Sequence, residues 1–314
     1  MTAEIVVIGS LNMDMVVSLN QRPRPGETVM GTHFFMNAGG KGANQAVAAQ
    51  KLGASVAMIG KLGSDTFADQ LLMSLEQVGV ECGAIEKVEG QETGIALVML
   101  DEVGENSIIV APGANLLLTP EDVRRHEQLI KQANLLMVQL EIPIETVMES
   151  VAIAKRYNVP VLLDPAPAQK LSAELLSMVD YIVPNETEIA QLTGRTVSDQ
   201  VTAKLAAVEL LRSGVSTVFA KLGEKGVVVI NTNSTHVVEP YKVEAVDSTA
   251  AGDAFAGAVG AALVKGKDVW TAAKFASAIG ALTVTRKGAQ ASMPSLEDAE
   301  RFIKEEAQRE RSLR

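Results

Sequence analysis

The chain has 314 residues, of which 47% are apolar and 21% are charged, and its formal net charge is −10. This acidic balance disfavours nucleic acid as a partner, because contacts with a phosphate backbone need a basic face. The chain has a single cysteine, Cys82, which excludes an intramolecular disulfide. It shows neither a signal-peptide pattern nor an apolar run of ~20 residues, so we expect a cytoplasmic protein that does not span a membrane.

Short apolar runs recur along the chain, as expected of strands that are buried on both faces of a parallel sheet. They lie at residues 5–8, 56–59, 135–138, 161–163, 181–183, 218–220 and 227–230. Helical periodicity separates most of them, as in the segment marked by Phe67, Leu71 and Leu75. This alternation predicts an α/β fold: a three-layer α/β/α, Rossmann-like core with a mostly parallel sheet.

Two stretches interrupt this alternation and contain no helical pattern. Residues 15–38 are predicted to form two strands around a Pro/Gly turn at residues 22–26, and residues 93–111 to form two strands joined near residues 102–105. We predict that these two stretches form a small inserted β-sheet, a lid over a cleft, and that residues 1–14, 39–92 and 112–314 form the α/β core. The alternative is two ordinary edge hairpins packed on the core.

A late stretch, residues 247–255 (DSTAAGDAF), places small residues, a glycine and a carboxylate before an apolar helix. Asp253 is predicted in the first helical turn, where backbone N–H groups have no intrahelical partner. Such a helix start is a ready anion site, and Asp253 is then a candidate base beside a bound phosphate. The alternative is that Thr249 or Asp247 simply caps the helix.

Polar residues follow two strands and precede one early helix. Lys41 and Asn44, in the glycine-rich segment GGKGAN, offer donors for hydroxyls or phosphate oxygens, although a plain glycine turn is the alternative. Asn12 and Asp14 alternate after the first strand, so both are expected to face one pocket that suits a polyol, unless they form an Asx turn. Glu141, beyond another strand, is either a ligand group or solvated.

Two further segments have a structural and a functional interpretation. Asn185 and Glu188 are three residues apart at a predicted helix start, where they form either a capping box or oxygen contacts to a hydrated Mg²⁺. Residues 221–226 (KLGEKG) join two strands as a tight turn that is also a candidate nucleotide-binding loop.

Taken in order, residues 9–14, 39–46, 185–188 and 247–253 resemble the signature segments of the ribokinase family of carbohydrate kinases. Residues 164–168 (DPAPA) and 285–290 (TRKGAQ) are also similar to that family, and the resemblance covers nearly the whole chain. It implies ATP-dependent phosphorylation of D-ribose at O5. The sequence departs from the family pattern at Ser248, Ala250, Lys221 and Ser277.

The resemblance implies roles for individual residues. Asp253 corresponds to the catalytic base, and Ala250, Ala251 and Gly252 correspond to the anion hole over the transferred phosphoryl group. Sugar contacts correspond to Asn12, Asp14, Gly40, Lys41, Gly42, Asn44, Glu141 and Asp253. ATP contacts correspond to Asn185, Lys221, Gly223, Gly226, Gly252 and Ser277.

The resemblance also implies metal ions and a partner subunit. Glu188 belongs to a motif linked to Mg²⁺ and phosphate. A monovalent-cation site for K⁺ corresponds to Asp247, Thr249, Thr283, Arg286, Gly288 and Ser292, some of which supply only backbone carbonyls. The inserted sheet corresponds to a lid that also forms a homodimer interface.

Several alternatives stay open. Asn12 favours ribose over deoxyribose, but a kinase for deoxyribose, fructose or a nucleoside, or a sensor that binds without turnover, also fits. A nicotinamide-dependent oxidoreductase is disfavoured because no glycine fingerprint follows the first strand. A helix N-terminus is expected to keep Asp253 ionised and hence a weak base, which a loose transition state tolerates because the proton leaves late.

Overall fold

The computed structural model describes residues 3–100 and 106–312. Its larger sheet has nine strands in the order β13-β12-β11-β10-β9-β8-β1-β4-β5. The central strands are β1 (Ile5–Ile8), β4 (Val56–Leu62), β8 (Leu135–Val138), β9 (Val161–Leu163), β10 (Tyr181–Ile182), β11 (Thr217–Lys221) and β12 (Val227–Asn231). Neighbouring strands from β5 to β11 are parallel, whereas β12 and β13 are antiparallel. The mostly parallel sheet that the apolar runs predict is confirmed.

The two outermost strands have no counterpart among the predicted apolar runs. β5 (Glu81–Lys87) and β13 (Thr235–Val238) lie at opposite edges of the sheet and are only partly buried. An edge strand is less covered by the helix layers, so some of its side chains are exposed and polar, and it lacks the continuous apolar run of a central strand.

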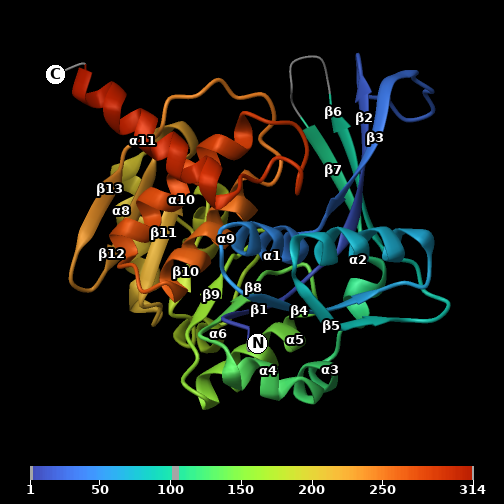
Figure 1. Ribbon diagram of the computed structural model, residues 1–314, viewed down its shortest axis with the longest axis horizontal. Helices are drawn as coiled ribbons and strands as arrows, with labels where there is room; N and C mark the ends of the chain where they lie inside the picture. Colours follow the sequence, from blue (N-terminus) through green and yellow to red (C-terminus); the bar gives the residue numbers. More distant parts are fainter. Residues whose placement is uncertain (1–2, 101–105, 313–314) are drawn as a thin grey trace.

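Helices cover both faces of this sheet (Figure 1). One layer contains α1 (Lys41–Lys51), α2 (Thr66–Val78), α9 (Ala251–Val264), α10 (Val269–Val284) and α11 (Leu296–Ser312). The other contains α3 (Pro120–Arg125), α4 (Glu127–Gln132), α5 (Ile144–Arg156), α6 (Ala173–Ser177), α7 (Glu186–Thr193) and α8 (Gln200–Arg212). Along β1, Ile5 and Val7 join the first core and Val6 joins the second, so side chains alternate between the layers.

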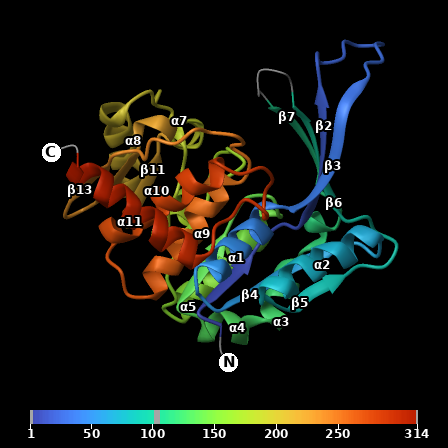
Figure 2. The same cartoon turned by 45° about the horizontal axis from the view of Figure 1, so that its top comes forward.

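A second sheet stands away from this body (Figure 2). It has the order β3-β2-β6-β7, from β3 (Gly31–Gly39), β2 (Asn12–Leu19), β6 (Gly94–Leu100) and β7 (Asn106–Ala111). β2 pairs with β6 in parallel, so the four strands form one mixed sheet, and the alternative of two separate edge hairpins is wrong. The predicted turn at residues 102–105 lies outside the described residues.

At its base, this sheet begins earlier than the pattern predicts. β2 starts at Asn12 rather than Met15, so Asn12 and Asp14 lie within a strand, and the Asx-turn interpretation is wrong. Both residues are buried where the second sheet joins the body.

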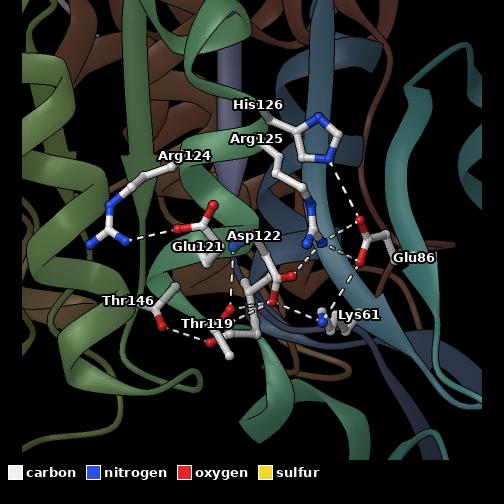
Figure 3. A network of polar contacts seen from close by, with 10 residues as sticks. Lys61, Glu86, Thr119, Glu121, Asp122, Arg124, Arg125, His126 and Thr146 are labelled. Carbon is white, nitrogen blue, oxygen red and sulfur yellow. Dashed lines mark hydrogen bonds and ion pairs between the residues drawn. The ribbon is translucent and has the colours of Figure 1, made fainter.

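A network of charged residues ties the β5 edge of the larger sheet to α3 (Figure 3). Lys61 Nζ on β4 lies 2.8 Å from Asp122 Oδ2, and Arg125 contacts both Asp122 and Glu86. Thr119 and Asp122 form a capping box at the start of α3. Among the described residues, no helix is both long enough and apolar enough to cross a membrane.

Candidate active site

The site is built where the beginnings of two helices meet beyond the carboxyl ends of the central strands. α1 begins at Lys41, directly after Gly40, whose φ of 87° favours glycine. A Cβ on Gly42 would lie 2.7 Å from the Gly9 carbonyl carbon, so only glycine lets α1 lie this close to the end of β1. The predicted glycine turn before the helix is therefore present. Lys41 and Asn44 follow it, in the first turn of α1.

The second helix, α9, begins without a side-chain cap. Its N-cap residue is Ala250, in the left-handed conformation with φ 59°. Asp247 instead accepts hydrogen bonds from the backbone N–H groups of Thr249 and Gly288, each at 2.9 Å. The interpretation that Asp247 or Thr249 caps this helix is wrong. α9 begins without a side-chain cap, and the Ala251 amide donates to the Ser248 carbonyl oxygen at 3.3 Å.

Asp253 lies in the first turn of α9 and is 6% exposed. Its Oδ2 accepts a hydrogen bond from Asn44 Nδ2 at 2.9 Å, and its Oδ1 accepts one from Gln45 Nε2 at 3.4 Å. Burial raises the pKa of Asp253 to about 6; the Lys41 ammonium opposes this shift, and the Asp164 carboxylate adds to it. Asp253 is therefore a stronger base than the helix terminus alone predicts, and it remains ionised at neutral pH.

The predicted sugar-contact residues converge around Lys41. Burial, followed by repulsion from Glu141 and Asp253, raises the pKa of Asp14 to about 7. Burial disfavours the charged form of Lys41, but attraction by Asp253, Glu141 and other carboxylates outweighs it and raises the pKa of the ammonium. Glu141 Oε2 accepts from Ser10 Oγ at 2.5 Å and from the Lys41 amide at 3.3 Å, so it is engaged rather than solvated.

Two buried amide side chains, those of Asn44 and Asn12, each keep an atom available for a hydrogen bond with a sugar. Asn44 Oδ1 is buried and has no hydrogen-bond partner, although its Nδ2 is engaged with Asp253. Asn12 is 2% exposed, and its Oδ1 accepts from Asn115 Nδ2 at 2.8 Å. An unpaired buried amide oxygen is costly and calls for a donor such as a hydroxyl group.

The predicted nucleotide-side residues lie at the beginning of α7, at the end of β11 and at the beginning of α9. Asn185 and Glu188 form a capping box, with each backbone N–H bonded to the other side chain at 2.9 and 2.7 Å, so this interpretation is confirmed. Lys221 pairs with Asn185 as an isolated β-bridge, and its Nζ lies 3.3 Å from Asp164 Oδ1. A Cβ on Gly252 would lie 3.4 Å from the same Nζ, so this ammonium stands beside the beginning of α9.

The remaining nucleotide-side candidates lie on a turn and on α10. Gly223 and Gly226 flank the turn between β11 and β12, and both have positive φ. Ser277 is partly buried on α10, one turn before Gly280, where a Cβ would lie 3.8 Å from the Ala251 carbonyl oxygen. α10 therefore packs against the beginning of α9, which brings Ser277 to the same side of the site.

The residues of the predicted monovalent-cation site lie in two segments, 247–249 and 283–292. Asp247 links them through its hydrogen bonds with the Thr249 and Gly288 amides. Arg286 bonds through its backbone to Thr283 O and through its guanidinium to Asp298, and Ser292 Oγ donates to Ala289 O. Within the described residues there is no group of three or more His, Cys, Asp or Glu side chains that could hold a metal ion. A cation between these segments would depend on backbone carbonyl and hydroxyl oxygens.

Sequence reasoning assigned no role to three buried polar residues behind Asp253. Gln45 Nε2 donates to Asp164 Oδ2 at 2.9 Å, and Gln45 Oε1 accepts from Gln139 Nε2 at 2.7 Å. Asp164 directly follows β9 at the carboxyl edge of the sheet, the placement that singled out Glu141, so the same rule would have found it.

The family described as pfkB family carbohydrate kinase matches residues 2–296 of the chain. The chain belongs to this family. A ribokinase of Haemophilus influenzae is 42% identical to this kinase over 303 residues, which cover 96% of this chain and 99% of that protein. A deoxyribokinase of Salmonella typhi is 38% identical over 301 residues, which cover 96% and 98%.

A solved structure of Arabidopsis thaliana ribokinase, complexed with ribose and ATP, resembles this kinase with a TM-score of 0.90 and 33% identity. The likeness covers 97% of this chain and 99% of that one. The kinase is therefore a ribokinase-like sugar kinase, a phosphotransferase, and the oxidoreductase alternative is wrong. Its relatives include enzymes named for two different sugars, so family membership alone leaves the sugar open.

Proposed function

We propose that this kinase transfers the γ-phosphoryl group of ATP to the 5-hydroxyl of D-ribose, giving D-ribose 5-phosphate. The observation that carries the proposal is the buried contact between Asn44 and Asp253 where α1 and α9 meet. It places a candidate base beside a helix N-terminus and next to an amide with a free acceptor oxygen. The Arabidopsis relative, which is named as a complex with ribose and ATP, supports the same pair of substrates.

The sugar would lie between β2 and the first turn of α1. Asn44 Oδ1, which is buried without a partner, would accept from one sugar hydroxyl, and the Asp14 carboxylate would accept from others. Lys41 and Glu141 would complete the polar wall, with the backbone of Gly40 and Gly42 close by. The second sheet would act as the lid, because Asp14 at the base of β2 lies on the sugar side and the same face of the sheet continues along β2, β3 and β6.

Asp253 would take the proton of the 5-hydroxyl as that oxygen bonds to phosphorus. A pKa near 6 leaves the carboxylate ionised at neutral pH and makes it a better base than an ordinary aspartate. In a loose phosphoryl transition state the proton leaves late, so a base of this strength is sufficient. The amides of Ala250, Ala251 and Gly252 would bind the oxygens of the transferred group.

ATP would lie across the Asn185 turn, the Gly223–Gly226 turn and Ser277. The Lys221 ammonium beside Gly252 would neutralise phosphate charge. Mg²⁺ would enter with ATP. Because the capping box engages both Glu188 carboxylate oxygens and Asn185 Oδ1, these residues fit Mg²⁺ through water molecules, which this ion retains readily.

A monovalent cation such as K⁺ would bind between residues 247–249 and 283–292. The donor chemistry fits, because hydroxyl and carbonyl oxygens of Thr249, Thr283, Gly288 and Ser292 lie in the segments that Asp247 holds together. The bound ion would shape the turn that leads into Ala250 and hence the anion hole.

The second sheet would also join two copies of the chain. Met36, Leu97 and Ile109 form one row across the sheet and are 43%, 41% and 58% exposed, and Phe34 on the same face is 61% exposed. This face points away from Asp14, so covering it with a partner's sheet would leave the sugar side intact.

The decisive assay is ADP release over a panel of D-ribose, 2-deoxyribose, fructose and a nucleoside, with the wild type and Asn12→Leu. We expect D-ribose to give the highest kcat/KM. Because Asn115 already engages Asn12 Oδ1, the Asn12 amide is left to donate to a sugar hydroxyl, and Asn12→Leu should reduce the ribose-to-deoxyribose preference about 10- to 100-fold.

Asn134→Leu, at an exposed asparagine before β8, is the matched control and should keep the preference. Equal turnover of deoxyribose by the wild type would favour the activity of the Salmonella relative, deoxyribose phosphorylation, as the second candidate function. Binding of ribose and ATP without ADP release would favour the sensor instead.

A further inference from the structure

A fully buried glutamine bridges two carboxylates behind the candidate base. Gln45 on α1 is 0% exposed, and its Nε2 lies 2.9 Å from Asp164 Oδ2 and 3.4 Å from Asp253 Oδ1. Its Oε1 accepts from Gln139 Nε2 at 2.7 Å. An ionised carboxylate only accepts hydrogen bonds, so the NH₂ group must face both acids, and Gln139 fixes the opposite end of the amide.

Asp253 is consequently held at both of its oxygens. Asn44 donates to Oδ2 and Gln45 donates to Oδ1, and these two amides are consecutive residues in the first turns of α1. A carboxylate bound at both oxygens has little freedom to rotate, so the remaining lone pairs keep a fixed direction. Asp164, which is 2% exposed, and Gln139 anchor Gln45 from two strand ends of the larger sheet.

We propose that Gln45 is a positioning residue for phosphoryl transfer, which holds the Asp253 carboxylate toward the sugar hydroxyl and is itself anchored by Asp164 and Gln139. The proposal rests on the proposed role of Asp253 as the base. Without the Gln45 hydrogen bond, the Asp253 carboxylate would turn away from the sugar hydroxyl. Small misplacements of a catalytic group lower turnover strongly and leave the substrate contacts in place.

The charges around Asp253 make the proposal testable through the pH dependence of kcat/KM. The ionisable groups that face this carboxylate are Lys41 on α1, Asp164 after β9, Glu141 after β8 and Asp14 on β2. A donor to the charged form lowers the pKa of an acid, and a neighbouring carboxylate raises it. Removing the Gln45 donor should therefore raise the pKa of Asp253, whereas neutralising Asp164 should lower it.

The test compares Gln45→Met, Asp164→Asn and the control Gln50→Met in the full chain. Gln50 lies on the same helix, and its side chain accepts from the Val56 amide, away from the site. We expect Gln45→Met to lower kcat about 10- to 100-fold with the sugar KM within about threefold of the wild type. The acidic limb of kcat/KM should move to higher pH in Gln45→Met and to lower pH in Asp164→Asn.

Circular dichroism establishes that each variant folds. If Gln45→Met does not fold, Gln139→Leu, which removes the donor that anchors Gln45 Oε1, carries the test through the same fall in kcat with little change in sugar KM. An acidic limb that stays in place in the folded variants, or a kcat for Gln45→Met equal to that of Gln50→Met, would overturn the positioning role. Asp253→Asn is measured in parallel. If it is inactive while Gln45→Met behaves like the wild type, the positioning role alone fails; if it is active, the proposed base fails as well.

Discussion

Asn44 Nδ2 donates to Asp253 Oδ2 over 2.9 Å, and this contact joins the first turns of α1 and α9, 209 residues apart in the chain. Each helix brings a different part of the chemistry. α1 brings an amide whose other end is free to accept from a ligand, and α9 brings a carboxylate beside uncapped backbone amides. Their meeting makes one site from two segments that are weak signals when taken separately.

Asp253→Asn removes the proposed base and keeps the shape of the side chain. We expect kcat to fall by about 10²- to 10⁴-fold, the range for loss of a general base, while calorimetry finds sugar binding within a few-fold of the wild type. In the wild type, kcat/KM should fall as pH drops below about 6, because protonation at a pKa of about 6 removes the base. Turnover close to that of the wild type in Asp253→Asn would reject the assignment.

Asp14→Asn should stabilise the protein at alkaline pH and weaken sugar binding. The carboxyl group has a folded-state pKa of about 7 against an ordinary value of 3.8, because burial disfavours its charge. The penalty is absent below pH 3.8, grows as pH rises through this interval and is complete above pH 7, where it is on the order of 2–4 kcal/mol.

Chemical unfolding of wild type and Asp14→Asn at pH 4 and pH 8 measures this effect. The variant should gain unfolding free energy at pH 8 and none at pH 4, and its sugar KM should rise at least about tenfold through loss of an ionised acceptor. A variant that is less stable than the wild type at pH 8 would mean that the ionised Asp14 is stabilised in the fold.

Asp247→Ala should uncouple the enzyme from K⁺. Asp247 holds the Thr249 and Gly288 amides at 2.9 Å each, so its removal frees the turn that leads into the anion hole. We expect wild-type kcat to rise with K⁺ but not with choline, and the variant to be about 10- to 100-fold slower with no K⁺ response. Equal wild-type rates in K⁺, Na⁺ and choline would contradict a cation site here.

A double variant of the second sheet, Phe34→Asp with Ile109→Asp, should be monomeric. The two side chains are 61% and 58% exposed on the face turned away from Asp14, and two carboxylates there oppose burial against a second sheet. Sedimentation velocity should find a dimer for the wild type and for Met73→Asp, an equally exposed change on α2. A monomeric wild type would refute the interface.

The core of the fold could be predicted because its strands are buried on both faces. Residues 135–138 and 161–163 coincide with β8 and β9, where an unbroken apolar run has no competing interpretation. The edge strands β5 and β13 are partly polar, and no periodicity distinguishes them from loops.

The candidate site was predictable only in part, for two physical reasons. The start of α9 carries Asp247 and Thr249, which suit a cap by residue type, yet Ala250 adopts a left-handed conformation and Asp247 bonds across to Gly288. The contacts of Gln45 with Asp164 and Asp253 span 119 and 208 residues, so no local pattern contains them. Burial within the assembled fold, which no local pattern reveals, is also what raises the pKa of Asp253 to about 6.

Asp122→Asn should destabilise the protein without changing its chemistry. Asp122 lies in the charged network at the β5 edge (Figure 3), on α3, which packs on the face of the larger sheet opposite to α9 and Asp253. Asp122 is 4% exposed and bonds Lys61 at 2.8 Å as well as the Thr119 backbone at 2.7 Å. The variant leaves the partly buried Lys61 ammonium without its main counter-charge, so we expect a loss of about 2–3 kcal/mol in unfolding free energy.

The pH dependence of this loss has a definite sign. Burial opposes ionisation of Asp122, but hydrogen bonds from Lys61 and Thr119 outweigh it and hold its pKa below 3.8. The stabilisation is therefore complete above pH 3.8 and disappears as pH falls through the lower folded-state value, so wild type and variant should converge in acid. Glu121→Gln, at the neighbouring exposed ion pair with Arg124, should change stability by less than about 0.5 kcal/mol. Equal losses in the two variants would show that burial of the Lys61 pair contributes nothing specific.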